Sequence, residues 1–192
     1  MTKILVSGKS KGCGKTTLIE KMIKNLRGKI YVIKSSIHDK YDQFELISEK
    51  EVINEKDTDT YIFNKAGAEK VFYLKSNQSA LKEGIEKEFK KIKGYDYLII
   101  EGNSIIDYIG FNLVYYLDKE GGDKKKSAEK CKKNAHIILD SDNNYKIKFN
   151  QDKISCFKAH IIGHSLNVPL KKVGKMIDKA NIKVKSCQLD LF

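Results

Sequence analysis

A short run near the amino terminus has the residue types and spacing that bind phosphate. It consists of Gly12, Cys13, Gly14, Lys15, Thr16 and Thr17, between an apolar stretch and an amphipathic one. Glycines let main-chain N–H groups fold closely around an anion, a lysine reaches the outer phosphates, and a hydroxyl binds Mg²⁺. We therefore predict that these residues bind a nucleoside triphosphate, with Lys15 on the β- and γ-phosphates and Thr16 on the metal.

The run departs from the usual phosphate-loop pattern at its first position. The pattern places its first glycine five residues before Gly14. This chain has Lys9 there, and the glycine stands one residue earlier, at Gly8. The strand before the run and the helix after it nevertheless match the context that the pattern requires.

An acidic residue further along the chain is placed to share the metal. The apolar stretch that begins at Asp96 ends at Glu101 and Gly102. In phosphate-loop proteins, an acid at the carboxyl end of such a strand lies beside the loop, where it orients Mg²⁺ or a metal-bound water. We predict Thr16 and Glu101 as metal residues, and Lys15 and Glu101 as the catalytic residues of a slow, Mg²⁺-dependent hydrolysis.

The elements that position these residues alternate between strands and helices. We predict strands from Lys3 and at 29–34, 70–74, 96–102, 111–117 and 135–139, and a short edge hairpin at 140–149. Helices are predicted to end near Arg27, at 59–68 with Asp57 or Asp59 as its cap, at 78–93, and near Lys133. This alternation predicts an α/β, three-layer phosphate-loop NTPase fold with a mostly parallel sheet in residues 1–150.

Residues 35–56 are polar and weakly patterned, so we interpret them as one long loop. A loop of that length in a compact domain is usually functional. His38 in this segment and Asp59 just after it are therefore candidates to lie over the phosphates. Lys9 or Lys11 is a further candidate, acting across a dimer interface or remaining solvated.

Residues 153–192 have a different texture and predict a small α-helical module. Helices at 155–164 and 170–180, with a turn at 166–169, fit a helix-turn-helix in which Gly163 lies at the crossing. The segment has eight lysines against Asp178 and Asp190. Its charge leaves DNA as an alternative partner, although base-edge readout favours Arg, Asn and Gln.

Composition limits the remaining choices. The 192 residues have a net charge of +12, which allows nucleic acid, polyphosphate or acidic partners. The first strand begins almost at once, and no apolar run approaches the ~20 residues of a membrane span, so we expect a cytoplasmic protein without membrane contact. Cys131, Cys156 and Cys187 show no metal-ligand spacing, and inert thiols are favoured over a metal site with His160 or His164.

Three stretches together resemble one family, the molybdopterin-guanine dinucleotide biosynthesis adapter proteins. They are Gly12 to Lys21; Lys34 to His38 with Asp59-Thr60 and Ala66-Gly67-Ala68; and Leu98 to Gly102, after which Asn103 and Ser104 depart from the family's pattern. The resemblance implies Mg²⁺-dependent binding of a nucleotide, GTP rather than ATP, a homodimer, and a supporting role with a cofactor-biosynthesis protein. From the residues alone ATP and GTP both remain open, because the chain has no Asn-Lys-x-Asp segment to read guanine.

The other functional class that the sequence leaves open is a nucleotide-sensing, DNA-binding regulator. In it, the phosphate-loop domain is the sensor and residues 153–192 are the DNA reader.

Overall fold

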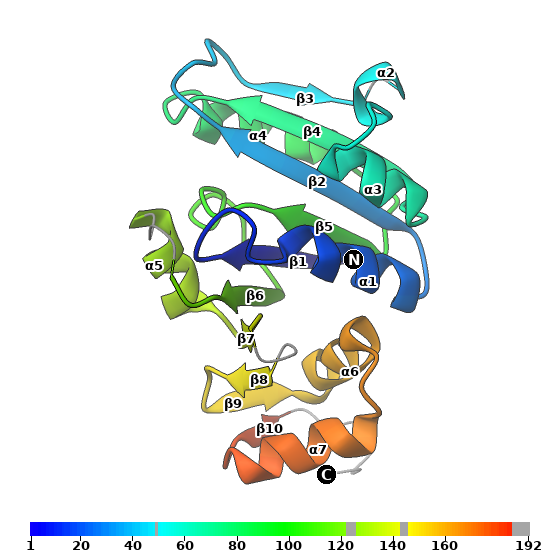
Figure 1. Cartoon of the computed structure of the whole chain (residues 1–192), viewed down its shortest axis with the longest axis vertical. Coiled ribbons are helices and arrows are strands. Elements are labelled where there is room, and N and C mark those ends of the chain that lie inside the picture. The colour runs from blue at the N-terminus through cyan, green and yellow to red at the C-terminus, as the bar shows by residue number, and fades with distance from the viewer. Residues whose placement is uncertain (49, 122–125, 143–145, 186–192) are drawn as a thin grey trace.

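The computed structural model of the chain describes residues 1–48, 50–121, 126–142 and 146–185. Its architecture is α/β in three layers, with helices on both faces of a central sheet (Figure 1). Within these ranges, eight strands form that sheet in the order β3-β4-β2-β5-β1-β6-β7-β8. The predicted α/β fold with a mostly parallel sheet is confirmed.

The four central strands run parallel and present their carboxyl ends at one edge. They are β1 (Thr2–Gly8), β2 (Ile30–Ile37), β5 (Tyr97–Glu101) and β6 (Leu113–Asp118). Ile4, Leu5 and Val6 of β1 are completely buried, because helices cover both sides of the sheet. β1 lies between β5 and β6, so that Val6 pairs with Glu101 on one side and Tyr115 on the other.

The outer strands extend the sheet and then end it. β4 (Lys70–Ser76) and β7 (Ile137–Asp140) continue the parallel order. At one edge of the sheet, β3 (Glu45–Ile47) pairs antiparallel with β4. At the other edge, β8 (Lys146–Phe149) pairs antiparallel with β7. The pairing of β7 with β8 agrees with the edge hairpin predicted at 140–149; residues 143–145 of that hairpin lie outside the described ranges.

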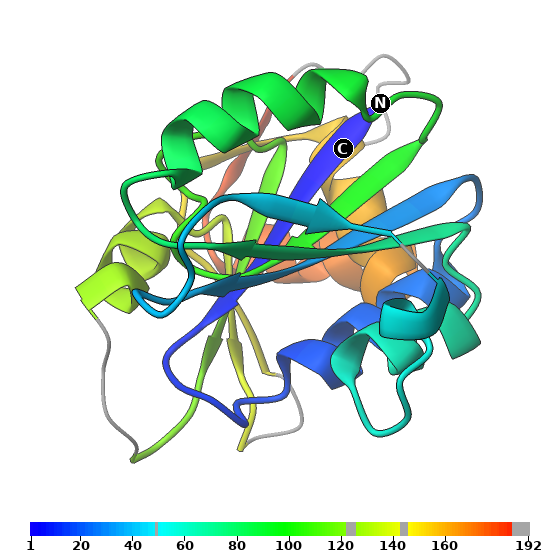
Figure 2. The same ribbon diagram turned by 90° about the horizontal axis from the view of Figure 1, so that it is seen from above.

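The helices divide between the two faces. Buried residues of α1 (Lys15–Asn25), α2 (Lys50–Ile53), α3 (Asp59–Lys65) and α6 (Cys156–Leu166) belong to one apolar cluster. Those of α4 (Leu81–Glu88) and α5 (Lys126–Asn134) belong to another, and Figure 2 shows α4 across the sheet from α1 and α3. The helix predicted at 78–93 is thus α4 followed by the 3₁₀ turn η1 (Phe89–Lys91). Among the described helices, none has the length and apolar character to cross a membrane.

The carboxyl-terminal segment contains the two predicted helices and two strands that were not predicted. β9 (Lys153–Ser155) leads into α6, and α7 (Leu170–Lys179) leads into β10 (Lys183–Lys185), which pairs in parallel with β9. Strands of three residues give too little alternation to be detected in a sequence. Ala159, Ile162 and Val173 share the apolar cluster of α1, so the segment packs on the main sheet layer. The division into domains at 1–150 and 153–192 stays a prediction.

Two local predictions are wrong. Residues 35–56 are not one loop, because β2 continues to Ile37 and is followed by β3 and α2. α3 is capped by Thr58, whose hydroxyl accepts a hydrogen bond from the Tyr61 N–H at 3.2 Å, and not by Asp57 or Asp59. The cap leaves the Asp59 carboxylate free to point away from its own helix.

Candidate functional site

The turn between β1 and α1 has the backbone of an anion-binding loop. Gly12 has φ +74° and Gly14 has φ +90°, a left-handed conformation that residues with a side chain rarely adopt. Gly14 stands at the N-cap of α1 but has no side chain with which to cap it. The first N–H groups and the positive dipole end of α1 are therefore directed at whatever lies in front of the loop.

Gly8 takes the place of the first glycine of the pattern, because the loop closes directly over it. A Cβ atom at this position would lie 2.3 Å from the Cys13 Sγ and 3.2 Å from the Leu117 carbonyl oxygen. Cys13 is only 1% exposed, so its side chain supports the loop from beneath. Although the glycine stands one residue earlier than in the usual pattern, the loop still packs closely against residue 8.

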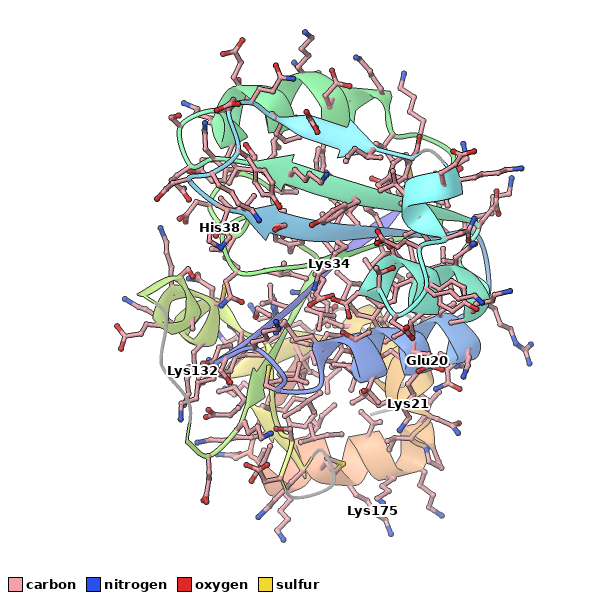
Figure 3. All side chains as sticks on the ribbon, turned by 45° about the horizontal axis from the view of Figure 1, so that its top comes forward. Glu20, Lys21, Lys34, His38, Lys132 and Lys175 are labelled. Atoms are coloured by element: carbon pink, nitrogen blue, oxygen red, sulfur yellow. The ribbon has the colours of Figure 1, made fainter. Side chains whose placement is uncertain are left out.

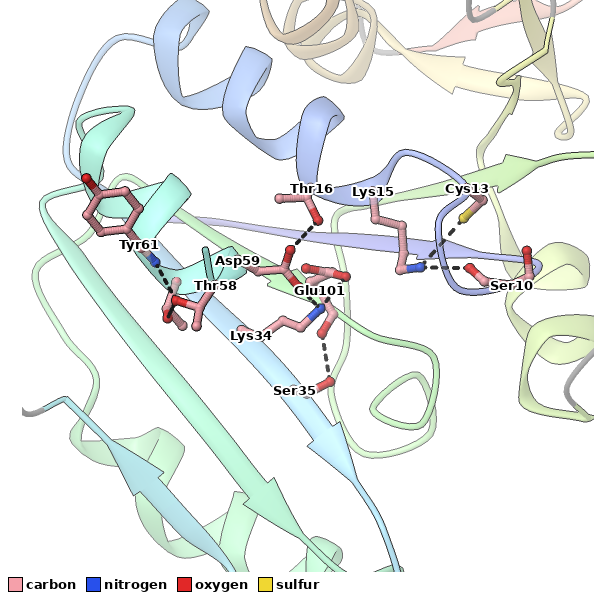
Figure 4. Close-up of polar contacts among 11 residues, drawn as sticks. Ser10, Cys13, Lys15, Thr16, Lys34, Ser35, Thr58, Asp59, Tyr61 and Glu101 are labelled. Atoms are coloured by element: carbon pink, nitrogen blue, oxygen red, sulfur yellow. Dashed lines mark hydrogen bonds and ion pairs between the residues drawn. The ribbon is translucent and has the colours of Figure 1, made fainter. Parts of the chain in front are cut away.

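The Lys15 side chain lies within the loop. Its Nζ donates a hydrogen bond to the Ser10 carbonyl oxygen at 3.0 Å and lies 3.6 Å from the Cys13 Sγ (Figure 4). The ammonium group therefore faces the same space as the loop backbone, as a phosphate-binding lysine requires.

Three elements bring a network of charged side chains to this loop (Figure 4). The Thr16 hydroxyl of α1 donates to Asp59 Oδ1 of α3 at 2.7 Å. The Lys34 ammonium of β2 contacts Asp59 Oδ2 at 2.5 Å and Glu101 Oε1 of β5 at 2.7 Å. The register of β2 against β5 pairs Lys34 directly with Glu101. The two carboxylates thus share one lysine beside the first turn of α1.

The network changes the acidity of its members. Burial raises the pKa of Glu101, a residue 2% exposed, and the Lys34 ammonium only partly offsets this shift. Burial also acts to raise the pKa of Asp59, but hydrogen bonds from Lys34 and Thr16 outweigh it and lower that pKa. Burial acts to lower the pKa of Lys34, yet the charges of Glu101 and Asp59 raise it. Lys34 therefore stays protonated and charged between the two carboxyl groups.

Most of the predicted residues line one pocket of about 580 Å³. Its lining comprises Gly8, Lys9, Ser10, Lys11, Gly12, Gly14, Lys15, Thr16, Lys34, Ser35, Ser36, Ile37, His38, Asp59, Tyr73, Glu101, Gly102, Asn103, Ser104 and Ser127. Thr17 is exposed and, like the buried Cys13, is not part of this lining. Figure 3 shows Lys34 inside the molecule and His38 near the end of β2.

Lys34 and Asn103 contribute to the site although the sequence did not predict them. The Asn103 side chain accepts from the Gly8 N–H at 3.1 Å and donates to the Gly8 carbonyl oxygen at 2.9 Å, which fastens the segment after Glu101 to the loop. The signal for Lys34 was available, because a lysine ends the apolar run of a strand expected to lie parallel in the same sheet as the strand ending at Glu101. Asn103 had only its departure from the resembled family as a signal.

A second cavity, of about 670 Å³, lies at the carboxyl ends of β6 and β7 and shares Lys9 with the first. Asp118 and Lys132 form an ion pair at 2.6 Å on its wall. The Tyr116 hydroxyl on the same wall is buried and has no hydrogen-bond partner within the described part of the chain. The space next to the loop is therefore larger than phosphates alone would fill.

Among the described residues, the cysteines and histidines that the sequence offers as metal ligands do not form a cluster. Within the described residues, no group of three or more His, Cys, Asp or Glu side chains has metal-binding geometry. The Cys131 Sγ donates to the Asn103 carbonyl oxygen at 3.3 Å, and the rings of His160 and His164 lie 6.4 Å apart. Cys187 lies outside the described residues.

A comparison with protein families matches residues 4–108 to the family described as Molybdopterin guanine dinucleotide synthesis protein B. The matched range runs from β1 past the end of β5, so it includes the loop, Asp59 and Glu101. A comparison with curated proteins finds no match.

Proposed function

Because this chain belongs to the molybdopterin guanine dinucleotide synthesis protein B family, we propose that it binds a nucleoside triphosphate with Mg²⁺ as an accessory protein in molybdopterin cofactor synthesis. The observation that carries the proposal is the shared pocket of the glycine loop, Lys15 and Glu101. In this pocket, Lys15 and the first N–H groups of α1 neutralise the β- and γ-phosphates.

The residues present fit a magnesium ion. Mg²⁺ prefers hard oxygen ligands, and Thr16, Asp59 and Glu101 supply one hydroxyl and two carboxylates around the first turn of α1. Glu101 Oε2 is buried and has no hydrogen-bond partner among the described residues, as expected of an atom that binds a cation or a cation-bound water. When bound, the ion would neutralise charge on the phosphate oxygens. Asp59 joins Thr16 and Glu101 as a proposed metal residue.

Slow hydrolysis is the reaction that this site supports. A water attacks the γ-phosphorus, the bond to the bridging oxygen breaks, and the products are a nucleoside diphosphate, phosphate and a proton. Lys15 and Lys34 supply positive charge for the transferred group. Arg27, the only arginine in the sequence, follows the far end of α1 and leaves the chain without an arginine near the phosphates.

GTP is the proposed nucleotide, and the second cavity is the proposed place for its ribose and base. The cavity adjoins the loop through Lys9, and its Asp118 carboxylate can accept hydrogen bonds, as guanine's N–H groups require. The family's name refers to a guanine dinucleotide. A homodimer, and contact with another protein of the same biosynthetic route, complete the proposal.

A nucleotide panel tests this function. Melting temperatures are measured with GTP, ATP, GDP and inorganic phosphate, each with and without Mg²⁺. A ligand at 100 times its Kd stabilises the folded chain by about 2.7 kcal/mol, so GTP with Mg²⁺ should give the largest rise. If ATP raised the melting temperature and GTP did not, the proposed nucleotide would be ATP instead of GTP. No rise with any triphosphate would contradict the proposal.

A second candidate function is DNA binding through α7. Lys171, Lys172, Lys175 and Lys179 are all exposed on this helix, and Gly163 allows the close crossing of α6 and α7. Binding to mixed duplex DNA over a salt series tests it, because phosphate contacts make affinity fall steeply with salt. Affinity that does not depend on salt would exclude this role.

A further inference from the structure

Lys34 occupies an unusual position for a lysine, with its ammonium between two carboxyl groups of the site. Its Nζ lies 2.5 Å from Asp59 Oδ2 and 2.7 Å from Glu101 Oε1. The Lys34 side chain is 23% exposed and that of Glu101 only 2%. Solvent screens such a sheltered ion pair only weakly, so the pair affects the binding of any other cation to those carboxylates.

Secondary structure places the backbone of Lys34 beside both carboxylates. Lys34 and Glu101 are paired in the register of two parallel strands, and Asp59 begins a helix capped by Thr58. Ser35, next in β2, donates through its hydroxyl to the Glu101 carbonyl oxygen at 2.7 Å. A Cβ at Gly102 would lie 1.9 Å from that hydroxyl, so the backbone approach at this point is close.

The same two carboxylates are the ones placed to bind a divalent cation. The second oxygen of Asp59 accepts from the Thr16 hydroxyl, and the second oxygen of Glu101 is the buried atom without a partner among the described residues. A hard cation and an ammonium need the same carboxylate lone pairs, and their like charges repel at such short range. One must therefore weaken the binding of the other.

We propose that Lys34 and the divalent cation compete for Asp59 and Glu101, and that the nucleotide's phosphates decide the competition by taking up the ammonium. Lys34 lines the same pocket as Lys15 and the glycine loop, so its flexible side chain can exchange carboxylates for phosphate oxygens there. Metal and nucleotide then bind cooperatively, since each removes the ammonium from the other's path. This inference rests on the proposed function.

Manganese binding to the full chain without nucleotide tests the competition. Mn²⁺ is the probe, and the paramagnetic resonance signal of the free ion reports its concentration. Lys34→Met should tighten Mn²⁺ binding by about 10-fold or more, because the competing charge is gone. Lys34→Arg, which keeps the charge, and Lys24→Met, which removes a lysine paired with Glu20 on α1, should stay within about 3-fold of the unmodified chain. Unchanged or weaker binding in Lys34→Met would overturn the proposal.

A stability measurement covers the case in which Lys34→Met folds poorly. Its melting temperature should rise with Mn²⁺ more than that of the unmodified chain, since the ion replaces the missing charge. No greater rise than for the unmodified chain would overturn the proposal as well.

A separate measurement of GTP affinity distinguishes failure of the proposed function from failure of the Lys34 competition. If the unmodified chain binds no triphosphate, the proposed function fails, while the manganese titration still decides whether Lys34 competes for the carboxylates.

Discussion

The carboxyl edge of the central strands and the carboxyl-terminal segment from β9 to β10 both carry many lysines, but they use them in opposite ways. At the strand edge, Lys15 and Lys34 are turned inward, onto a carbonyl oxygen and two carboxylates. In α7, the lysines are exposed, and Figure 3 shows Lys175 pointing away from the molecule. The second region packs on the core mainly through apolar side chains such as Val173 and Ile177.

The difference teaches that where a charge lies is more informative than how many charges there are. Residues 153–192 contribute half of the chain's net charge, yet their exposed lysines cost little to solvate and require no partner. Burying the Glu101 carboxylate without a positive charge beside it would cost much free energy. Its burial next to Lys34 is therefore a stronger indication of a functional site than the exposed lysines are. The two regions should therefore be separable in function, so that a substitution in one leaves the property of the other unchanged.

A large effect on ligand binding is expected at the strand edge from Asp59. Asp59→Ala removes the acceptor of the Thr16 hydroxyl and one of the two carboxylates that contact Lys34, so affinity for Mg²⁺ and GTP should fall by about 10- to 100-fold. Asp57→Asn is the matched control in the same segment, because Asn tolerates the positive φ of residue 57. Calorimetric titration measures both variants, and equal affinities would show that Asp59 is only structural.

A substitution in the other region should change stability without changing binding. A Cβ at Gly163 would lie 2.7 Å from Leu170 Cδ2 and 3.1 Å from the Val168 carbonyl oxygen. Gly163→Ala should lower the free energy of unfolding by about 1–2 kcal/mol with GTP affinity unchanged, because the contact with the Val168 carbonyl outweighs the ~1 kcal/mol that alanine gains over glycine inside a helix. Gly110→Ala, where nothing lies within 4 Å of the added atom, is the control in denaturant titrations. A parallel loss of GTP affinity would mean that the two regions are coupled.

The smallest effect concerns a polar contact between the carboxyl-terminal segment and the main sheet, at the amino end of β7 and away from the strand edge. His136 Nδ1 accepts from the Val114 N–H, and its Nε2 lies 2.8 Å from the Lys158 Nζ of α6. Burial, with a smaller effect of Lys158, lowers the pKa of His136 to about 4. Because the unfolded pKa is about 6.5, the stability from neutral His136 is complete above pH 6.5 and is lost as pH falls toward 4.

His136→Asn should flatten that decline by at most about 1 kcal/mol per pH unit, since solvent weakens the effect at a half-buried site. Thermal unfolding between pH 4 and 7 measures it, using the unmodified chain as the reference. An unchanged slope would assign the acid sensitivity to other groups.

Sequence predicted the parts of the site that depend on local pattern. The loop from Gly8 to Thr16 lies within one strand–turn–helix unit, and Glu101 ends an apolar strand. Both features can be predicted from the pattern of residues that are close together in the sequence. The hydrogen bond from Thr16 to Asp59 and the ion pair from Lys34 to Glu101 join residues distant in sequence, and they depend on strand register and helix packing. The prediction of one loop at 35–56 is wrong because pairing with β4 stabilises strand β3, whose sequence has only a weak strand pattern.

Titration of GTP with Mg²⁺ into the unmodified chain and into Lys15→Ala is the most direct test of the account. Lys15→Ala should lose more than about 100-fold in affinity, because its ammonium is the charge held within the loop. Lys21→Ala, an exposed lysine on the same helix, should bind as the unmodified chain does. Equal affinity of Lys15→Ala and the unmodified chain would contradict the central claim that this loop binds the triphosphate.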